Sequence, residues 1–404
     1  MIFDNKNDNS NLKLIAFIVF LLVIFISGWA IFANNLANFF IWDAGYYHKI
    51  SIENYNAYSK DTPAFFPLLP LIIASLKQNQ YLITLANTFF LCSGAIILQK
   101  IIKIDLKWWM FIILTSHFFY FFLPYTESIF FIGGAILLAG IHKKQTAITC
   151  LGIAICSLSR PVFVLLSFSF IVLFFIEWYV SKKRNYTLIF YSFLALFTTA
   201  CHFSYLKLKT GNWMAFFDAQ KLWGHKIEKG ITFPFELNHV AVGFFLIIAF
   251  VYCLVAIYFV LNVINFKIKS DRATLFSAIF LSSFLGLMIN IQTPDFSGLN
   301  RYILCSPFFV YFLIAIKKNF PNLFSNQKIL LFSIIAAVNI AFWSNLPLKN
   351  IITFFFSTIY FYFFYFFIPQ TKISKMCFYL YCLLLLGLQI YFLNRFIHFL
   401  WVSG

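Results

Sequence analysis

Apolar stretches of about 20 residues recur along the whole chain, and short polar segments separate them. A helix of about that length crosses a hydrocarbon core of roughly 30 Å. The pattern therefore predicts an all-α polytopic membrane protein, with about 11–13 transmembrane helices in one integral membrane domain, residues 1–404. The expected helices cover residues 12–33, 81–102, 108–123, 129–141, 146–159, 161–180, 186–206, 240–264, 273–290, 301–316, 328–346, 351–368 and 376–397.

Two segments of the N-terminal part differ from an ordinary span. Residues 12–33 follow a polar N-terminus and carry no cleavage site of small residues, so we expect a retained helix rather than a signal peptide. Residues 65–76 (FFPLLPLIIASL) are too short to span comfortably, and their two prolines lack a backbone N–H donor. This second segment predicts a re-entrant or interfacial helix.

Composition and charge narrow the class further. Hydrophobic residues make up 62% of the chain and charged residues 11%, too little charge to cover a water-soluble surface. The net charge of +17 comes from short Lys and Arg clusters between apolar stretches, as the positive-inside rule predicts, so we expect no nucleic-acid partner. The eight cysteines form no CxxC pair and indicate small buried hydrophobes rather than a disulfide or zinc framework.

Placing the basic clusters on the cytoplasmic side gives a consistent alternation with a cytoplasmic N-terminus. The two longest polar segments, 34–80 and 207–238, then both face outward. Most acidic residues share that side, which indicates that any chemistry takes place on the outer face. These outward acids are Asp43, Glu53, Asp61, Glu127, Asp218, Glu228, Glu236 and Asp295.

The segment 41–50 (IWDAGYYHKI) places one carboxylate, Asp43, among aromatic and small residues near the outer end of the first helix. Burial raises the proton affinity of a carboxylate, whereas neighbouring cations such as His48 or Lys49 lower it. A base that takes a proton from a sugar hydroxyl needs a fixed orientation and partial removal from water, and this position could supply both. An aromatic belt with one solvated acid has the same sequence, so spacing alone leaves both interpretations open.

Three further charged residues stand at the expected outer ends of helices. Glu127, in the polar corner 124–128 (PYTES), either binds a substrate hydroxyl or pairs with a basic residue. Arg160 lies in a long apolar stretch, and because burying a charge there costs free energy, the residue is a functional candidate. The structural alternative is a salt bridge to Glu127. Arg301 lies at the start of an expected helix. It either binds a phosphate through two N–H donors or extends its side chain to the membrane–water interface.

The second long outward segment contains a possible amphipathic helix. Phe216, Gln220 and Trp223 follow helical spacing, which predicts a helix on the membrane surface. Lysines in this segment break the positive-inside pattern, and they are explained either by a phosphate-bearing lipid substrate or by ordinary anionic headgroups. They are Lys207, Lys209, Lys221, Lys226 and Lys229.

Several common catalytic signatures do not occur in the sequence. It has no GxxxxGK[ST] loop, HExxH or GxSxG, and no DxD pair in an outward segment. We therefore expect neither a metal nor a cofactor. Without a metal, fixed cations have to stabilise the leaving group, which suits a sugar donor whose leaving group is a lipid monophosphate.

The ordered motifs resemble those of the PIG-V-like mannosyltransferases, relatives of GPI mannosyltransferase II in the GT-C class of multi-span transferases. They are WDAGYYHKI (42–50), AFFPLLP (64–70), YTES (125–128), SLSRP (157–161), TGNWMAF…AQKLWG (210–224) and GLNRYILCSPFF (298–309). The resemblance implies a GT-C-type bundle with functional loops on the outer face, a catalytic core over residues 12–320 and C-terminal transmembrane helices over 321–404. Asn212 stands where a GD-type version of its loop has Asp. The chain carries no eukaryotic retention signal, so we expect a bacterial inner membrane.

The resemblance also implies an activity, namely inverting, metal-independent transfer of mannose or another hexose. The sugar would move from a polyprenyl-phosphate donor to a hydroxyl of a glycan, lipid or protein acceptor, among membrane lipids. By matching position, Asp43 is the expected catalytic base. The residues expected to bind donor or acceptor are Trp42, Tyr46, Tyr47, His48, Glu127, Arg160, Trp213, Gln220, Lys221, Trp223, Arg301 and Tyr302.

Two other classes of protein have a similar composition. A lipid-linked-saccharide flippase or transporter would also have outward basic residues, but it usually keeps ionisable residues near the midplane. A non-catalytic assembly partner explains the bundle but not the ordered outward motifs. An outward cavity around Asp43 favours the enzyme, and a midplane cavity between symmetric halves favours transport.

Overall fold

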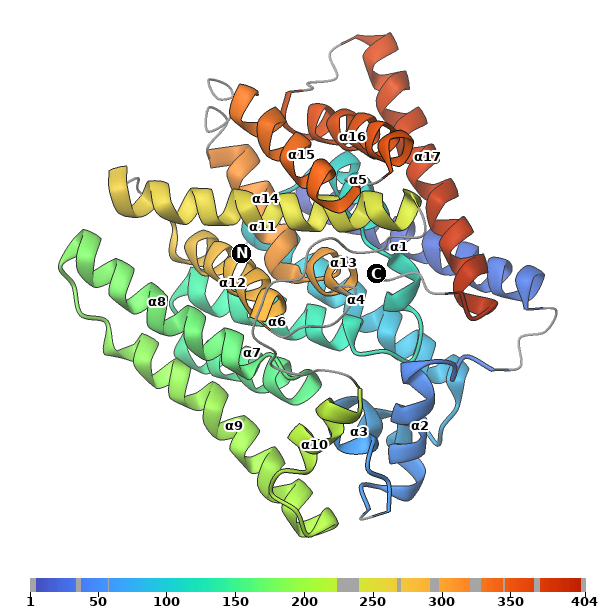
Figure 1. The fold of residues 1–404 in the computed structure, drawn as a ribbon, viewed down its shortest axis with the longest axis vertical. Helices are drawn as coiled ribbons and strands as arrows, with labels where there is room; N and C mark the ends of the chain where they lie inside the picture. Colours follow the sequence, from blue (N-terminus) through green and yellow to red (C-terminus); the bar gives the residue numbers. More distant parts are fainter. Residues whose placement is uncertain are drawn as a thin grey trace.

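The computed structural model describes residues 5–33, 38–56, 58–223, 240–266, 270–290, 298–319, 328–343, 346–366 and 371–400. Every regular element in these ranges is helical, which confirms the all-α class (Figure 1). Among the described residues, six helical segments are long and apolar enough to cross a membrane by length and composition, which is compatible with a polytopic membrane protein. They are Asn9–Phe32, Gln80–Ile102, Phe163–Ser181, Tyr186–Thr210, Val242–Asn265 and Lys372–Ile397.

The six spans belong to helices of 19 to 28 residues, and further helices of at most 19 residues pack between them (Figure 1). The long helices are α1 (Asn5–Phe32), α4 (Gln80–Ile102), α8 (Phe163–Ser181), α9 (Tyr186–Thr210), α11 (Val240–Phe266) and α17 (Lys372–Ile397). The shorter ones are α5 (Leu106–Thr115), α6 (Glu127–Lys143), α7 (Thr146–Ser159), α12 (Arg272–Asn290), α13 (Leu299–Leu304), α14 (Pro307–Asn319), α15 (Lys328–Trp343) and α16 (Pro347–Phe361).

Small helices of the two long polar segments gather at one end of the bundle. They are α2 (Asp43–Glu53), α3 (Leu68–Ser75) and α10 (Ala215–Leu222), with a 3-10 turn, η1 (Thr62–Ala64). The helices expected around residues 65–76 and 216–223 are therefore present. In α3, Pro67 is the N-cap and Pro70 lies in the first turn, where a missing N–H leaves no helical hydrogen bond unmade.

Two stretches expected as single helices are each divided. Residues 108–123 form most of α5 and a separate 3-10 helix, η2 (Phe118–Phe121). The two are separate because Ser116 adopts an extended conformation and its Oγ donates to the Ile113 carbonyl over 2.7 Å. Residues 301–316 divide between α13 and α14. Pro307 disfavours a helical conformation at Ser306, so the first helix ends and Pro307 begins the next.

Helices α6 and α7 form an antiparallel hairpin with very close backbones. A Cβ added at Gly152 of α7 would lie 2.4 Å from the backbone nitrogen of Leu137 on α6. A Cβ at Gly140 would lie 2.5 Å from the backbone nitrogen of Thr149. Small residues allow such an approach between apolar helices, where dispersion contacts replace the hydrophobic effect as the source of stability. The hairpin is therefore a rigid support for the residues at its open end, Glu127 and Arg160.

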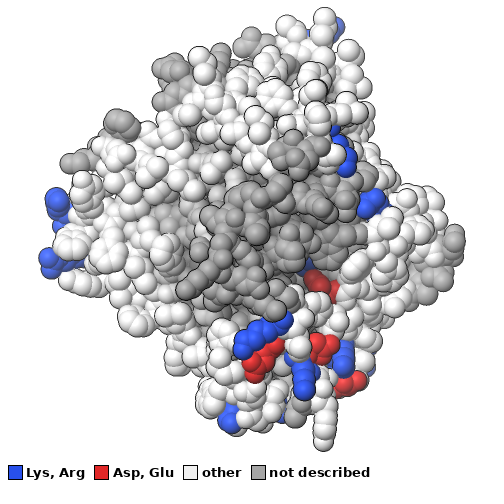
Figure 2. Space-filling view, in the orientation of Figure 1, with Lys and Arg blue, Asp and Glu red and all other residues white. Residues whose placement is uncertain are grey.

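The two ends of the bundle differ in charge. Figure 2 shows acidic and basic side chains interleaved over α2, α3 and α10, whereas only basic side chains are visible at the turn between α8 and α9. That turn carries Lys182, Lys183 and Arg184, all exposed. Because α8 begins three residues after Arg160 and runs away from it, this basic end lies at the opposite side of the bundle from the open end of the α6–α7 hairpin.

Adding one methyl group to the α6–α7 contact should destabilise the fold. Gly152→Ala places a Cβ against backbone atoms that cannot rotate away, and overpacking of this kind costs about 1–3 kcal/mol. Gly387→Ala on α17 is the control, because an added Cβ there meets nothing within 4 Å. Thermal unfolding in detergent should show a lower midpoint for Gly152→Ala and an unchanged or higher one for Gly387→Ala. Equal midpoints would mean that the close approach contributes no stability.

Candidate active site

Four charged side chains from four separate elements form one network at the α2 end of the bundle. The Arg160 Nη2 atom lies 2.6 Å from the Glu127 Oε1 atom, an ion-pair contact without hydrogen-bond geometry. Arg301 donates through Nε to the same Glu127 oxygen and through Nη1 to Asp43 Oδ2 over 3.1 Å. Arg160 also donates through Nε to the Thr126 hydroxyl over 2.7 Å. Glu127 is thus shared by both guanidinium groups, and Arg301 links it to Asp43.

The positions of these residues follow from the ends of their helices. Glu127 is the first residue of α6 and Arg160 is the C-cap of α7, so the tight hairpin places them side by side. Asp43 is the first residue of α2, where a negative charge is favoured by the helix dipole. Arg301 lies in α13, whose N-cap Gly298 has φ 86°, a left-handed conformation that favours glycine.

The corner before α6 is fixed by buried hydrogen bonds. The Ser128 hydroxyl donates to the Phe121 carbonyl over 2.6 Å, and the Asn87 side-chain amide on α4 donates to the Leu123 carbonyl. The Tyr125 hydroxyl donates to the Ile41 carbonyl over 3.4 Å, which connects the corner to the segment before Asp43. Glu127 and Asp43 are therefore positioned by one connected backbone framework.

Exposure divides the network into a buried part and an accessible part. The side chain of Glu127 is 0% exposed, that of Arg160 5% and that of Arg301 8%, whereas that of Asp43 is 33% exposed. Rings enclose the cations, since Tyr120 and Tyr125 each lie 4.6 Å from the Arg301 guanidinium carbon. Among the four charged groups, Asp43 is therefore the one that a molecule outside the protein reaches first.

The pKa of Glu127 depends mainly on burial and on its two arginine partners, Arg160 and Arg301. Burial by itself raises the pKa of a carboxyl group, but the guanidinium groups of Arg160 and Arg301 outweigh it and hold the pKa of Glu127 below its ordinary value. Glu127 is thus a permanent negative charge that balances the buried cations. An ionised, fully enclosed carboxylate is suited to positioning Arg160 and Arg301 rather than to exchanging protons.

Two polar atoms of the network, one on Arg301 and one on Asp43, have no hydrogen bond to the described residues. Arg301 uses Nε and Nη1 for its carboxylate contacts, which leaves Nη2 available. Asp43 uses Oδ2, which leaves Oδ1 available. The network thus includes a donor on a buried cation and an oxygen on a half-buried carboxylate that make no hydrogen bond to the described residues.

Trp42, directly before Asp43, has an unusual backbone and holds the C-terminal helix. Its φ of 55° and ψ of −134° lie in a region that non-glycine residues rarely adopt, at a cost of about 1–3 kcal/mol. Its indole Nε1 donates to the Phe396 carbonyl at the end of α17 over 3.2 Å, and its ring lies 5.7 Å from that of Phe399. The contacts between Trp42 and the end of α17 thus stabilise the strained backbone conformation directly before Asp43.

An aromatic cluster joins three of the sequence motifs. The Tyr46 ring stacks on Phe65 at 5.0 Å and meets the edge of Trp223 at 5.0 Å. The Trp223 indole donates to the Asp61 carbonyl over 3.4 Å. Residues of α2, of the segment before α3 and of the end of α10 therefore form one wall beside Asp43.

Two other α2 residues have distinct surroundings. Tyr47 is buried, and the pKa of its hydroxyl is raised first by burial and then by the nearby charge of Asp43. His48 stacks on Phe40 at 4.1 Å, and burial lowers its pKa below the ordinary value. The cation beside Asp43 is consequently Arg301, 258 residues away in sequence, and not the neighbouring His48 or Lys49 that the sequence had suggested.

Besides Tyr47 and His48, the predicted site residues divide into three groups. Asp43, Glu127, Arg160, Arg301 and Tyr302 come together, with the Tyr302 ring 5.1 Å from the Arg160 guanidinium carbon. Tyr46 and Trp223 form the adjoining aromatic wall, while Trp42 contacts α17. Within the described part of the chain, no hydrogen bond, ion pair or ring contact joins the network to the remaining three, Trp213, Gln220 and Lys221.

The loop before α10 has its own local structure. Lys221 pairs with Asp218 over 3.3 Å, and Trp213 is 58% exposed. The Asn212 side-chain amide donates to Asp218 over 3.0 Å, and its oxygen accepts from the Met214 backbone N–H. The pKa of Asp218 is lowered by Asn212 and then by Lys221. An Asp at position 212 would bring two carboxylates together, which explains why Asn suits this chain.

Sequence reasoning missed Tyr120, Thr126 and Phe396, which surround the network. Tyr120 lies in an unbroken apolar stretch, and Phe396 is near the end of the chain, so neither position carries a local signal. In the described residues, no group of three or more His, Cys, Asp or Glu side chains is placed to hold a metal ion. The chain matches no family model, no curated protein and no solved structure.

Neutralising Glu127 should destabilise the protein strongly. Glu127→Gln keeps the shape but leaves two buried guanidinium groups without their shared counter-charge, a loss of about 3–5 kcal/mol. Asp218→Asn is the control, because its pair with Lys221 is exposed and should affect the unfolding midpoint little. Thermal unfolding of both variants in detergent provides the measurement. A similar, small effect in both would contradict a structural role for Glu127.

Proposed function

We propose that the protein is an inverting, metal-independent glycosyltransferase of GT-C type. It moves a hexose, in our proposal mannose, from a polyprenyl-phosphate donor to an acceptor hydroxyl on the outer face of a bacterial inner membrane. The proposal combines the PIG-V-like motifs with the geometry of their residues. The single observation that carries it is the partly exposed Asp43 carboxylate held by a buried cation, Arg301.

In this mechanism, Asp43 is the general base. The acceptor O–H approaches the free Oδ1 atom, and its proton moves to Asp43 as the oxygen attacks the anomeric carbon. The new C–O bond forms while the bond from that carbon to the phosphate oxygen breaks, and the lipid phosphate leaves with the bonding electrons. The Arg301 Nη2 donor is available to neutralise the developing charge, as a fixed cation must where no metal is used.

The Asp43–Arg301 pair has to open during this reaction. In an inverting displacement the base and the leaving group lie on opposite faces of the sugar. Asp43 and an Arg301 side chain that binds the leaving phosphate therefore have to give up the 3.1 Å contact between Nη1 and Oδ2. The contact therefore represents the resting state, in which Arg301 holds the Asp43 carboxylate in place. A donor phosphate replaces Asp43 as the partner of Arg301 and releases the carboxylate to act as base.

Glu127 and Arg160 support this exchange without taking part in the chemistry. Glu127 retains its contact with the Arg301 Nε atom, so the guanidinium stays in place when its Asp43 contact opens. Arg160 balances the Glu127 charge and limits the cost of burying it. The remaining motif residues, including Trp213, Gln220 and Lys221, are assigned to the acceptor side because the network itself does not include them.

A lipid-linked-saccharide transporter is the alternative class. Transporters place ionisable residues near the middle of the membrane, in broken helices of two related halves. Here Asp43 and Glu127 are the first residues of their helices and Arg160 is a C-cap, so the charges gather at helix ends. This placement favours chemistry at a surface over passage through the bundle.

Replacing the proposed base should remove activity without unfolding the protein. We expect Asp43→Asn to lower transfer by about 10²–10⁴-fold, the usual contribution of general base catalysis. The assay uses purified protein in liposomes with a panel of radiolabelled polyprenyl-phosphate hexoses. Glu53→Gln, at the other end of α2, is the control, because it removes an exposed carboxylate that takes no part in the network.

The outcomes separate the classes of protein. Transfer that requires Asp43 but not Glu53 supports the enzyme. Wild-type transfer by Asp43→Asn would rule out the assignment of the base. Movement of an intact donor across the bilayer, without transfer and independent of Asp43, would replace the enzyme by the transporter.

A further inference from the structure

Two aromatic residues with positive φ pack against each other where α17 ends beside the site. Trp42, directly before Asp43, has φ 55°, and Phe399, at the end of α17, has φ 58°. Their ring centroids lie 5.7 Å apart. Residues other than glycine rarely adopt such a φ, and the conformation persists only where neighbouring contacts hold it. Each of the two residues therefore helps to hold the strained backbone of the other.

The end of α17 has the hydrogen bonds of a Schellman motif. The Leu400 N–H donates to the Arg395 carbonyl over 2.9 Å, and the Phe399 N–H donates to the Phe396 carbonyl over 3.2 Å. Glycine is the usual residue at the position of Phe399, because it has no Cβ. The Phe399 side chain is 62% exposed, so its burial does not explain the strain. Glycine would relieve the strain but would remove the ring that contacts Trp42.

The same turn of α17 contacts the surroundings of both Asp43 and Arg301. On the Asp43 side, the Phe396 carbonyl accepts from the Trp42 indole over 3.2 Å. On the Arg301 side, the Phe396 ring lies 5.5 Å from Tyr120, one of the rings that enclose the guanidinium. This end of the helix is thus in contact with both halves of the ion pair's framework.

The start of α2 depends on the backbone of Trp42. The Ala44 N–H donates to the Ile41 carbonyl over 3.2 Å, and the Gly45 N–H donates to the Trp42 carbonyl over 3.0 Å. The two hydrogen bonds enclose Asp43 in a single turn. A change in the Trp42 backbone would therefore weaken both of them and move the Asp43 side chain.

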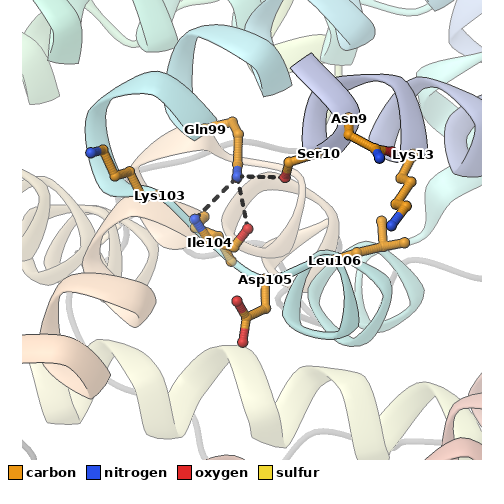
Figure 3. Close-up of a pocket in the computed structure, with 8 residues that line it drawn as sticks. All are labelled: Asn9, Ser10, Lys13, Gln99, Lys103, Ile104, Asp105 and Leu106. Carbon is orange, nitrogen blue, oxygen red and sulfur yellow. Dashed lines mark hydrogen bonds between the residues drawn. The ribbon is translucent and has the colours of Figure 1, made fainter. Parts of the chain in front are cut away.

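Helix α1 is a fixed support for the end of α17. At the start of α1, the Gln99 amide nitrogen of α4 donates to the Ser10 hydroxyl over 3.2 Å and to the Ile104 carbonyl over 2.8 Å (Figure 3). Near the other end of α1, Gly28 allows α17 to come close, since an added Cβ would lie 2.9 Å from the Leu393 Cδ2 atom. The end of α17 is thus held on a helix that is itself fastened to the bundle.

We infer that Trp42 and the end of α17 form a latch that positions Asp43. The latch consists of the ring contact between Trp42 and Phe399 and the hydrogen bond from the Trp42 indole to the Phe396 carbonyl. It holds the backbone before Asp43, so an exchange of partners between Asp43 and Arg301 needs only side-chain movement. Trp42 and Phe399 are thus positioning residues. The latch can be measured without any activity, whereas its effect on turnover rests on the proposed function.

Phe399→Gly separates the latch from the stability of α17. Glycine is preferred at this position of the motif, so the variant should keep the unfolding midpoint or raise it. Without the ring, hydrogen exchange at Ala44 and Gly45 should accelerate by about 3–10-fold, as expected for the loss of one aromatic pair. The measurements are hydrogen exchange by mass spectrometry and thermal unfolding, both on the full-length protein in detergent.

Lys182→Gly is the matched control. Lys182 is exposed and has φ 56° at the end of α8, so glycine relieves the same kind of strain away from the site. Exchange at Ala44 and Gly45 should stay unchanged in this variant. Unchanged exchange in Phe399→Gly would overturn the latch, as would equal acceleration in both variants. Acceleration with a clearly lower midpoint would overturn it too, because Phe399 would then stabilise α17 rather than position Asp43.

The transfer assay tests the effect on turnover separately. In liposomes, Phe399→Gly should lower kcat about 10-fold and leave the KM for the donor nearly unchanged, because Arg301 and the rings around it are not altered. Accelerated exchange with an unchanged kcat would overturn the positioning role. A wild-type protein without transfer would contradict the proposed function, and the exchange result would still decide whether the latch exists.

Discussion

The structure around the site depends on one interaction, the sharing of the Glu127 carboxylate by two guanidinium groups. Burying this charge alone would be prohibitive, and burying either arginine alone would be as costly. Together they form a neutral unit once Asp43 joins Arg301, with two acids and two bases in contact. The four helices that supply these side chains, α2, α6, α7 and α13, therefore have to pack against one another in the same folded state. The close α6–α7 packing fixes the distance between Glu127 and Arg160.

Much of the architecture and part of the site were accessible from sequence. Apolar stretches located the long helices because hydrophobic length is a strong and local signal, and Arg160 and Glu127 were conspicuous as charges in apolar surroundings. The partner of Asp43 could not be predicted, because Arg301 is 258 residues away and the local sequence offers neighbouring cations such as His48 and Lys49. Nor could the contact of Trp42 with α17 be predicted, since tertiary packing and not a motif brings Phe396 there.

The C-terminal helix consequently belongs to the site and is more than an appended span. Phe396 packs against Tyr120 and Tyr125, the rings that enclose Arg301, and its carbonyl holds the Trp42 indole. Trp42 stores backbone strain directly before Asp43, and strain persists only where surrounding contacts over-determine it. Displacement of α17 would therefore change both the orientation of the Asp43 side chain and the packing of aromatic rings around Arg301.

The balance of charge at the α2 end has a consequence for how the network could bind an anion. Two arginines are matched there by two carboxylates, so the network has no excess charge. An anion that binds Arg301 therefore has to replace Asp43 as its partner, because no unbalanced positive charge is available to hold it beside the pair. In the proposed transfer the same exchange is reversed when the phosphate leaves, since the Asp43 carboxylate is there to take its place. A balanced network of this kind releases its anionic product more readily than a site with excess positive charge would.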